Sequence, residues 1–325
     1  MSVFKLCPVF KDYIWGGTRL RDEFGKQCSF DRVAESWELA CRSDGCCTVC
    51  GGRYDGKTLD ELIRLEGKEI LGQRCKDGNF PLLVKLIDAH DDLSVQVHPD
   101  DRYALEHEGD QGKTEMWYVL GCEKDAGIIC GFDSELTKSE LVSAIQQGGL
   151  LDRVRRFRVR KGDAFFIPSG TLHAICKGTL VVEIQQNSNT TYRVFDYNRL
   201  GRDGKPRELH TDKAVEVIST EPAEPLINCE AVSCGSFGYT VLVKCRYFTA
   251  VKFDTQDKVT LHIDGQSFAH LLILEGSCSA QGVQAQKGDS LFITAASGTV
   301  AIHGRCSFIL TRTGCEEGID SLVEK

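Results

Sequence analysis

Long hydrophobic runs are missing from this sequence of 325 residues. No apolar stretch approaches the roughly 18 residues that a membrane helix needs, so we expect no membrane-embedded part. The opening residues, MSVFKLCPVFKDY, also lack the apolar core of a signal peptide. Together these absences predict a cytoplasmic protein.

An excess of basic residues is also missing. Lysine and arginine number 39 against 47 aspartates and glutamates, which gives a formal net charge of −8. Proteins that bind nucleic acids usually carry a basic stripe that displaces counterions from phosphates, so we expect no nucleic-acid partner. An anionic small molecule is still acceptable as a substrate, provided that basic residues gather locally around it.

Cysteine is abundant, with 16 residues, but the second half of a zinc motif is missing. The stretch CRSDGCCTVC holds Cys41, Cys46, Cys47 and Cys50, and no further cysteine or histidine pair at regular spacing follows it. A disulfide framework is typical of short exported chains, which this one does not resemble. We therefore predict ordinary reduced thiols in a strand and a turn, rather than a structural zinc site or a redox centre.

Glycine is plentiful, with 32 residues, and many glycines separate short β-like runs. Such runs predict a mainly β protein, with a sandwich or barrel rather than alternating β-α units. Helical signals are few. Capping boxes that begin at Thr58 and Thr137 predict two helices, and a third is expected from His210. The clearest strand candidates are PLLVKLIDA, LSVQVH, EMWYVLGC, AGIICGF, DAFFIPSG and LVVEIQQN.

An internal repeat indicates how the chain is organised. The segment KGDAFFIPSGTLHAI from Lys161 returns in weaker form as KGDSLFITAASGTVAIHG from Lys287. Two copies of one β-barrel unit would explain this pattern, and STEPAEPL, with Pro222 and Pro225, is typical of a linker between them. We predict a metal-binding catalytic domain over 1–224, with a helical insertion near 133–157, and a second domain over 225–325.

The first copy carries a group of candidate metal ligands. In LSVQVHPDD, strand alternation places Gln96 and His98 on one face and the two valines on the other. Glu115 begins the strand candidate EMWYVL, and His173 lies in PSGTLHAI. Imidazole nitrogens with a carboxylate suit zinc, and three strong ligands with a weaker one are typical of an open, catalytic site.

The second copy serves as an internal comparison. It has no histidine at the position of His173, and the position of Glu115 falls near Ala269, beside a His270 that lacks partner ligands. We therefore expect metal to bind in the first domain only.

Several motifs resemble one known family. LSVQVHPDD, GKTEMWYVL, IPSGTLHAI and VVEIQQNSNTTYRVFDYNR are similar to the signature motifs of the type I mannose-6-phosphate isomerases in their short bacterial form. KDYIWGGTRL and ESWEL resemble the same family, whose members are zinc-dependent cupins, so the resemblance implies two cupin-like β-barrels of jelly-roll type. Carried over by position, it implies zinc ligands at Gln96, His98, Glu115 and His173 and active-site residues at Arg193, Lys113 and Glu183. The cysteine-rich stretch departs from the family pattern, but it holds none of these positions.

The resemblance implies an aldose-ketose isomerase that interconverts D-mannose 6-phosphate and D-fructose 6-phosphate through an enediol or enediolate. One zinc ion per chain would stabilise the developing negative oxygen as a Lewis acid. The base that removes the C2 proton is open between Glu183, which we prefer, a zinc-bound water or hydroxide, and a histidine. Guanidinium groups suit the phosphate, and basic residues gather downstream at Arg193, Arg199, Arg202, Lys205 and Arg207.

Two alternative functions stay open from the sequence. A metal-dependent cupin oxygenase typically uses two or more histidines and keeps several positions free for oxygen, and Gln96 with the long NSNTTYRVFDYNR motif counts against it. A non-catalytic, sugar-phosphate-binding regulatory cupin would be expected to lose a ligand or Arg193, and all are present. A hexose 6-phosphate is the one partner predicted, and the oligomeric state is open.

Overall fold

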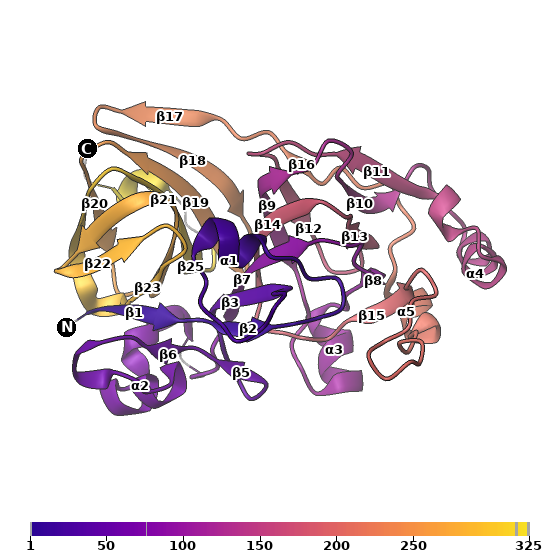
Figure 1. Ribbon diagram of the computed structural model, residues 1–325, viewed down its shortest axis with the longest axis horizontal. Coiled ribbons are helices and arrows are strands. Elements are labelled where there is room, and N and C mark those ends of the chain that lie inside the picture. The colour runs from indigo at the N-terminus through magenta and orange to yellow at the C-terminus, as the bar shows by residue number, and fades with distance from the viewer. Residues whose placement is uncertain (1, 76, 316–317, 324–325) are drawn as a thin grey trace.

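The computed structural model describes residues 2–75, 77–315 and 318–323. Two β-rich halves lie side by side, and the N-terminus lies beside the C-terminal half (Figure 1). The chain is mainly β, as predicted, and its large sheets are built from antiparallel pairs. Over the described ranges, no helix combines the length and the apolar character that crossing a membrane requires. The cytoplasmic location stays a prediction.

Three large sheets and one hairpin contain the strands. The seven-stranded sheet has the order β16 (Leu226–Ile227), β12 (Ala164–Ile167), β9 (Glu115–Cys122), β14 (Thr179–Gln186), β7 (Leu82–Ala89), β3 (Glu35–Leu39), β2 (Val9–Lys11). The five-stranded sheet has the order β11 (Val154–Arg158), β10 (Gly127–Phe132), β13 (His173–Ile175), β8 (Val95–Val97), β15 (Tyr192–Phe195). A short hairpin pairs β4 (Cys41–Arg42) with β5 (Gly45–Cys46).

The 11-stranded sheet forms most of the C-terminal half. Its main path has the order β17 (Ala231–Cys234), β18 (Phe237–Lys244), β19 (Phe248–Thr255), β25 (Cys306–Thr313), β21 (Ala269–Ala280), β23 (Ser290–Ile293), β1 (Val3–Cys7), β6 (Thr48–Val49). Off this path lie β20 (Lys258–Ile263), β22 (Val283–Gln286) and β24 (Gly298–His303).

Five α-helices lie around the described sheets: α1 (Arg19–Phe24), α2 (Leu59–Glu66), α3 (Asp101–Glu108), α4 (Lys138–Gln147) and α5 (Thr211–Val217). The three predicted helices are confirmed as α2, α4 and α5, and both predicted capping boxes are present, at Thr58 and Thr137. Helices α1 and α3 were not predicted from the sequence. The signal for α3 was available, because the Asp100 side chain caps its first turn and Gly109 ends it in the left-handed conformation.

The seven-stranded sheet is buried on both faces. Because side chains alternate along a strand, one set faces the five-stranded sheet, among them Ile87, Val119 and Val181. The other set packs against the C-terminal half, where Leu86, Met116 and Val182 join Phe268 and Phe292 in one cluster. This sheet is therefore the shared wall between the two halves, and it fixes the position of any site on its first face.

Closed barrels are not what the strand pairing shows. The seven-stranded and five-stranded sheets each run from one edge to the other, from β16 to β2 and from β11 to β15. The predicted mainly β character is confirmed, but these sheets are not closed barrels, and the arrangement as two cupin-like barrels of jelly-roll type stays a prediction. Alternation in a sequence identifies strands but does not say whether the outer strands of a sheet meet. β1 and β6 also join the C-terminal sheet, while β16 joins the seven-stranded one. The domain boundary near residue 225 stays a prediction.

The cysteine-rich stretch departs from its prediction at one position. Cys50 forms a disulfide with Cys7, with 5.8 Å between their Cα atoms. The prediction of reduced thiols is therefore wrong for Cys50, while Cys41, Cys46 and Cys47 are free thiols as expected. Cys7 lies 43 residues away in the chain, and spacing within CRSDGCCTVC could not identify it as a partner.

A buried ion pair joins the two halves. The Lys26 ammonium lies 2.6 Å from Glu38 Oε1, and both side chains are almost fully buried. Lys26 also donates to the Gly288 carbonyl, and the Ser290 hydroxyl donates to Glu38 Oε2 at 2.9 Å. The two charges, both from the N-terminal half, thus neutralise each other, and groups from the C-terminal half hydrogen-bond to them, so the pair depends on correct packing of the halves.

We expect Lys26→Met to destabilise the protein by about 3–5 kcal/mol, because removing one partner leaves the Glu38 charge buried without its counterion. Thermal unfolding of the two variants Lys26→Met and Arg64→Ala measures the difference. Arg64 pairs with Asp60 on the exposed surface of α2, and its loss is expected to cost less than about 0.5 kcal/mol. Equal melting temperatures for the two variants would contradict the structural role of the Lys26–Glu38 pair.

Candidate metal centre and active-site cavity

The five-stranded sheet aligns three predicted site residues in one row. His173 of β13 and Arg193 of β15 are both cross-strand partners of Gln96 in β8. Directly opposed residues point to the same face of a sheet, so these side chains lie together on the face toward the seven-stranded sheet. Val95 and Val97 are buried in the cluster on the opposite face. The predicted alternation in LSVQVH is confirmed.

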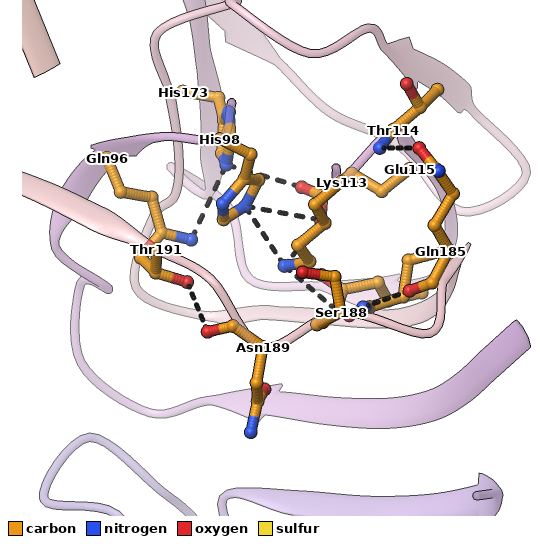
Figure 2. Close-up of polar contacts among 12 residues, drawn as sticks. Gln96, His98, Lys113, Thr114, Glu115, His173, Gln185, Ser188, Asn189 and Thr191 are labelled. Atoms are coloured by element: carbon orange, nitrogen blue, oxygen red, sulfur yellow. Dashed lines mark hydrogen bonds and ion pairs between the residues drawn. The ribbon is translucent and has the colours of Figure 1, made fainter. Parts of the chain in front are cut away.

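Glu115 meets this row from the facing sheet. Its Oε1 lies 3.3 Å from His173 Nε2, and its Oε2 lies 3.5 Å from His98 Nε2. Gln96 Nε2 is 3.5 Å from His173 Nε2, and a half turn of the amide would put its oxygen there instead. The ligand atoms of His98, Glu115 and His173 lie within 4.8 Å of one another. Figure 2 shows His98, His173 and Gln96 turned toward one another. The structure thus brings all four predicted ligands together.

Backbone carbonyls fix the orientation of both histidine rings. His98 Nδ1 lies 2.9 Å from the Thr190 carbonyl, and His173 Nδ1 lies 2.8 Å from the Thr171 carbonyl. A carbonyl only accepts, so each Nδ1 must carry the hydrogen, which leaves the Nε2 lone pair of a neutral ring free. Metal-ligating histidines are commonly held by such a bond from the other ring nitrogen.

Burial keeps the two histidines neutral. Burial, together with the Lys113 ammonium, lowers the pKa of His98 to about 3. Burial also lowers the pKa of His173, and the Glu115 carboxylate only partly offsets this. For Glu115, burial favours the protonated form, but Lys113 and the two histidines outweigh it and hold the pKa well below its usual value. The site therefore offers two neutral imidazoles and one carboxylate, the protonation states that metal binding requires.

The donor set fits a metal ion. Both Glu115 oxygens are buried, and within the described ranges neither accepts a well-directed hydrogen bond. Buried polar atoms normally have hydrogen-bond partners. The two Glu115 oxygens without such partners, together with the two neighbouring Nε2 lone pairs, form a ligand set suited to a cation that prefers nitrogen and oxygen ligands. Within the described ranges, no other group of three histidine, cysteine or acidic residues comes together in this way.

Among its described residues, the second half has no matching group of ligands. Glu115 is the cross-strand partner of Ile167 in the first half, and Ala269 is the partner of Ile293 in the second. Ile167 and Ile293 occupy matching positions in the repeat, so Ala269 stands where the first half has Glu115. His270 is buried and points into the cluster between the halves.

A cavity of about 290 Å³ lies beside the ligand cluster. It is lined by polar side chains, among them Gln96, Lys113, Glu183, Arg193 and Arg207. Lys113 connects the cavity with the ligands, because its ammonium is 2.8 Å from Glu115 Oε2 and 3.0 Å from His98 Nε2. All three predicted active-site residues, Lys113, Glu183 and Arg193, are thus gathered in one cavity.

Buried charges alternate along the cavity floor. Lys85 lies 3.6 Å from Glu35 and 3.0 Å from Glu183, and Lys113 lies 3.9 Å from Glu183 and 2.8 Å from Glu115. Three carboxylates thus face two ammonium groups, which leaves one negative charge without a counterion among these five side chains. Burying a net charge costs several kcal/mol, so this row favours the entry of a cation.

Glu183 is held as a carboxylate. Burial and the nearby Glu115 both raise its pKa, but Lys113, Lys85 and a hydrogen bond from Trp117 together lower the pKa below its usual value. Trp117 Nε1 donates to Glu183 Oε2 at 2.8 Å. Glu183 Oε1 is buried, and within the described residues it accepts no well-directed hydrogen bond, although the Lys85 ammonium lies 3.0 Å away.

Two residues of the predicted basic cluster reach the cavity, Arg193 and Arg207. Arg193 donates to the Glu208 carbonyl at 2.8 Å, and its Nε is buried without a hydrogen-bond partner among the described residues. Arg207 donates to Asp196 through Nε at 2.8 Å. Arg199 also pairs with Asp196 but does not line the cavity, and Arg202 pairs with Asp12 at 2.7 Å.

Sequence reasoning missed part of this site. It did not identify Lys85 and Trp117, which contact Glu183, or Glu35, which pairs with Lys85. One signal was available, because Lys85 is the single charge in the middle of the apolar strand PLLVKLIDA, and a lysine there must be buried with a counterion. Glu35 and Trp117 gave no such signal, since their contacts depend on strands far apart in the chain.

Comparisons with known proteins agree with this geometry. A family model described as phosphomannose isomerase type I, catalytic domain, matches residues 3–119, and one described as mannose-6-phosphate isomerase, cupin domain, matches residues 239–313. The probable mannose-6-phosphate isomerase GmuF of Bacillus subtilis is 42% identical over 312 residues, which are 94% of this chain and 98% of that protein. The mannose-6-phosphate isomerase ManA of the same organism is 41% identical over 311 residues, 94% of this chain and 96% of that protein.

Solved structures give the same result. The crystal structure of mannose 6-phosphate isomerase from Bacillus subtilis matches with a TM-score of 0.88 and 39% identity, covering 96% of this chain and 99% of that one. Fold, cavity and relatives thus define a sugar-phosphate isomerase with a cupin domain and a candidate metal site. The chain belongs to the type I phosphomannose isomerase family.

We expect the purified protein to retain a divalent metal ion, and His173→Ala to lose it. Removing a nitrogen ligand should weaken metal affinity by more than roughly 100-fold, since even outer partners of a ligand contribute 10–100-fold. Elemental analysis after dialysis measures the metal content. His262→Ala is the control, because His262 is exposed on β20, outside the cluster. Equal metal content in both variants would exclude His173 as a ligand.

Proposed function

We propose that this enzyme interconverts D-mannose 6-phosphate and D-fructose 6-phosphate through an enediolate. The observation that carries the proposal is the cavity, which combines a His–Glu–His cluster with a buried lysine, a buried carboxylate and two arginines. The chemistry needs a group that removes the C2 proton, positive charge beside the developing oxygen, and cations for the phosphate. Relatives named as mannose-6-phosphate isomerases support the same substrate.

We propose that zinc is the metal, held by His98, Glu115 and His173 with Gln96 as the weaker ligand. Neutral imidazoles and a carboxylate suit zinc, and a weak fourth ligand suits a catalytic rather than a closed site. When bound, zinc would supply Lewis-acid stabilisation of the negative charge that the substrate oxygens develop, without redox chemistry of its own.

We propose that Glu183 is the base that removes the proton from C2 of the substrate. Its pKa lies below the usual value, so at neutral pH it is a carboxylate, the form that accepts a proton. Oε2 is occupied by Trp117, while Oε1 lies toward the two lysines and the cavity. Oε1 would take the proton from C2 and return it to C1. Lys113, 3.9 Å from Oε1, would hold the substrate oxygens by donating to them.

We propose that Arg193 and Arg207 bind the 6-phosphate of the substrate. Both line the cavity, and guanidinium groups bind phosphate through paired, charge-assisted hydrogen bonds. Asp196 fixes Arg207 by accepting from its Nε, which lowers the entropy lost when the arginine binds substrate.

The internal repeat supports different roles for the two halves of the chain. We propose that residues 1–224 form the catalytic, metal-binding cupin domain and residues 225–325 a cupin-like domain without ligands. The alternatives raised from the sequence are less well supported. Two arginines in the cavity suit an anionic substrate group rather than molecular oxygen, and a regulatory protein would not need the buried Glu183 and Lys113 beside the ligand cluster.

We expect the protein to convert mannose 6-phosphate to fructose 6-phosphate, to lose activity on chelation and to regain it with zinc. His173→Ala should be inactive at ordinary zinc concentrations. Glu183→Gln should keep its zinc but lose kcat by roughly 10²–10⁴-fold, the usual contribution of a general base. A coupled assay that follows fructose 6-phosphate measures all three.

Glu208→Gln is the matched control for Glu183→Gln, because its side chain is exposed. Stoichiometric zinc without turnover of any hexose phosphate would reject the proposed reaction. Full kcat in Glu183→Gln, with the reaction intact, would reject only the assignment of the base.

We expect Arg207→Met to raise KM for mannose 6-phosphate by roughly 10–100-fold with a smaller change in kcat, because a charge-assisted hydrogen bond contributes about 1.5–3 kcal/mol. Arg202→Met is the control, since Arg202 pairs with Asp12 outside the cavity lining. Steady-state kinetics of the two variants distinguishes them. An unchanged KM in Arg207→Met would remove Arg207 from the phosphate site.

A further inference from the structure

The hairpin β4–β5 places two cysteines directly opposite each other. Cys41 is the cross-strand partner of Cys46. The adjacent pair is hydrogen-bonded, because the Cys47 amide donates to the Ala40 carbonyl at 2.9 Å. Hydrogen-bonded and non-hydrogen-bonded pairs alternate in antiparallel strands, and the Cα atoms of the latter are about 4.5 Å apart. That separation falls within the range of roughly 4.4–6.8 Å that disulfides span.

The surroundings of Cys46 activate its sulfur. The Cys41 thiol and the backbone at Leu59 and Asp60 lie beside the Cys46 sulfur and favour its thiolate form. Leu59 and Asp60 begin α2, and the amino end of a helix stabilises a thiolate. The hydrogen bond from Cys41 is the largest effect, and despite the opposing effect of burial the pKa of Cys46 falls to about 6.

The pair is also accessible. Both side chains are partly exposed, and Cys41 lines a surface groove of about 330 Å³ together with Arg42 and Asp60. The neighbouring Cys47 differs in every respect: it is buried, its thiol donates to the Trp37 carbonyl at 3.2 Å, and burial raises its pKa. Cys50 is already bonded to Cys7.

We propose that Cys41 and Cys46 form a redox-active dithiol that undergoes thiol–disulfide exchange with a low-molecular-weight disulfide such as oxidised glutathione. The Cys46 thiolate attacks one sulfur of the disulfide, whose S–S bond breaks and releases one thiolate. Cys41 then loses its proton and attacks the Cys46 sulfur, which expels the second thiolate. The two cysteines are oxidised by two electrons, and the disulfide is reduced to two thiols. The inference is independent of the proposed isomerase reaction.

The dithiol lies next to residues that contact the active site. Arg42, which follows Cys41, donates to the Asn187 carbonyl. Asp44, in the turn of the hairpin, accepts a hydrogen bond from Asn189 Nδ2 at 2.5 Å. Asn189 lines the active-site cavity. Asp44, which contacts this cavity residue, lies two residues from Cys46, so a covalent change in the hairpin occurs close to the cavity wall.

Tryptic peptides provide a direct test. Cleavage after Arg32, Arg42 and Arg53 places Cys41 in peptide 33–42 and Cys46 in peptide 43–53. The full chain is equilibrated with buffers of reduced and oxidised glutathione, quenched with acid, alkylated and digested. We expect at least about half of peptide 33–42 to become disulfide-linked to peptide 43–53 in the most oxidising buffer, and to be released again by reduced glutathione.

Two variants separate the candidate partners within peptide 43–53. Cys47→Ser should form the link as the wild type does, whereas Cys46→Ser should leave peptide 33–42 free. Cys41→Ser should stop at the first step, with glutathione retained on Cys46. A peptide 33–42 that stays unlinked at every glutathione ratio in the wild type would overturn the proposal, as would an undiminished link in Cys46→Ser.

Discussion

Negative charge buried between two sheets is the constraint on which the site depends. Glu115 and Glu183 are almost fully buried, and such carboxylates stay ionised only if cations stay beside them. Lys113 touches both, Lys85 holds Glu183, and the row ends at Glu35 with one negative charge uncompensated. A cation bound at the cluster would offset this charge, so one electrostatic requirement accounts for both the ligand cluster and the lysines around it.

This constraint also explains the difference between the halves. The first half places polar side chains on the inner face of its seven-stranded sheet, at Lys85, Glu115 and Glu183. In the second half the inner faces carry apolar side chains, such as Phe253, Leu271 and Phe308. An apolar interior packs without counterions and stabilises its own half. The seven-stranded sheet packs against this apolar half on one face and lines the polar cavity with its other face.

The sequence predicted what depends on local patterns. Strand alternation predicted that Gln96 and His98 share a face, and capping boxes at Thr58 and Thr137 located two helices. The family resemblance supplied Lys113, Glu183 and Arg193, and the cavity brings these three together.

The sequence could not predict what depends on contacts between distant segments. Open sheets in place of barrels, the bond from Cys7 to Cys50 and the pairing of Lys85 with Glu35 each join residues far apart in the chain. Likewise, CRSDGCCTVC gave no sign that a tight turn would set Cys41 against Cys46 beside the start of α2. Turn type and helix position decide that contact.

We propose that a zinc ion completes the cluster of His98, Glu115 and His173. Anomalous diffraction from crystals of the purified protein, collected on both sides of the zinc absorption edge, tests this most directly. We expect one anomalous peak per chain, about 2.0–2.2 Å from both Nε2 atoms and a Glu115 oxygen, with Gln96 as the fourth protein ligand. A cluster without anomalous density in zinc-containing buffer, or a peak at the cysteines of the β4–β5 hairpin instead, would contradict it.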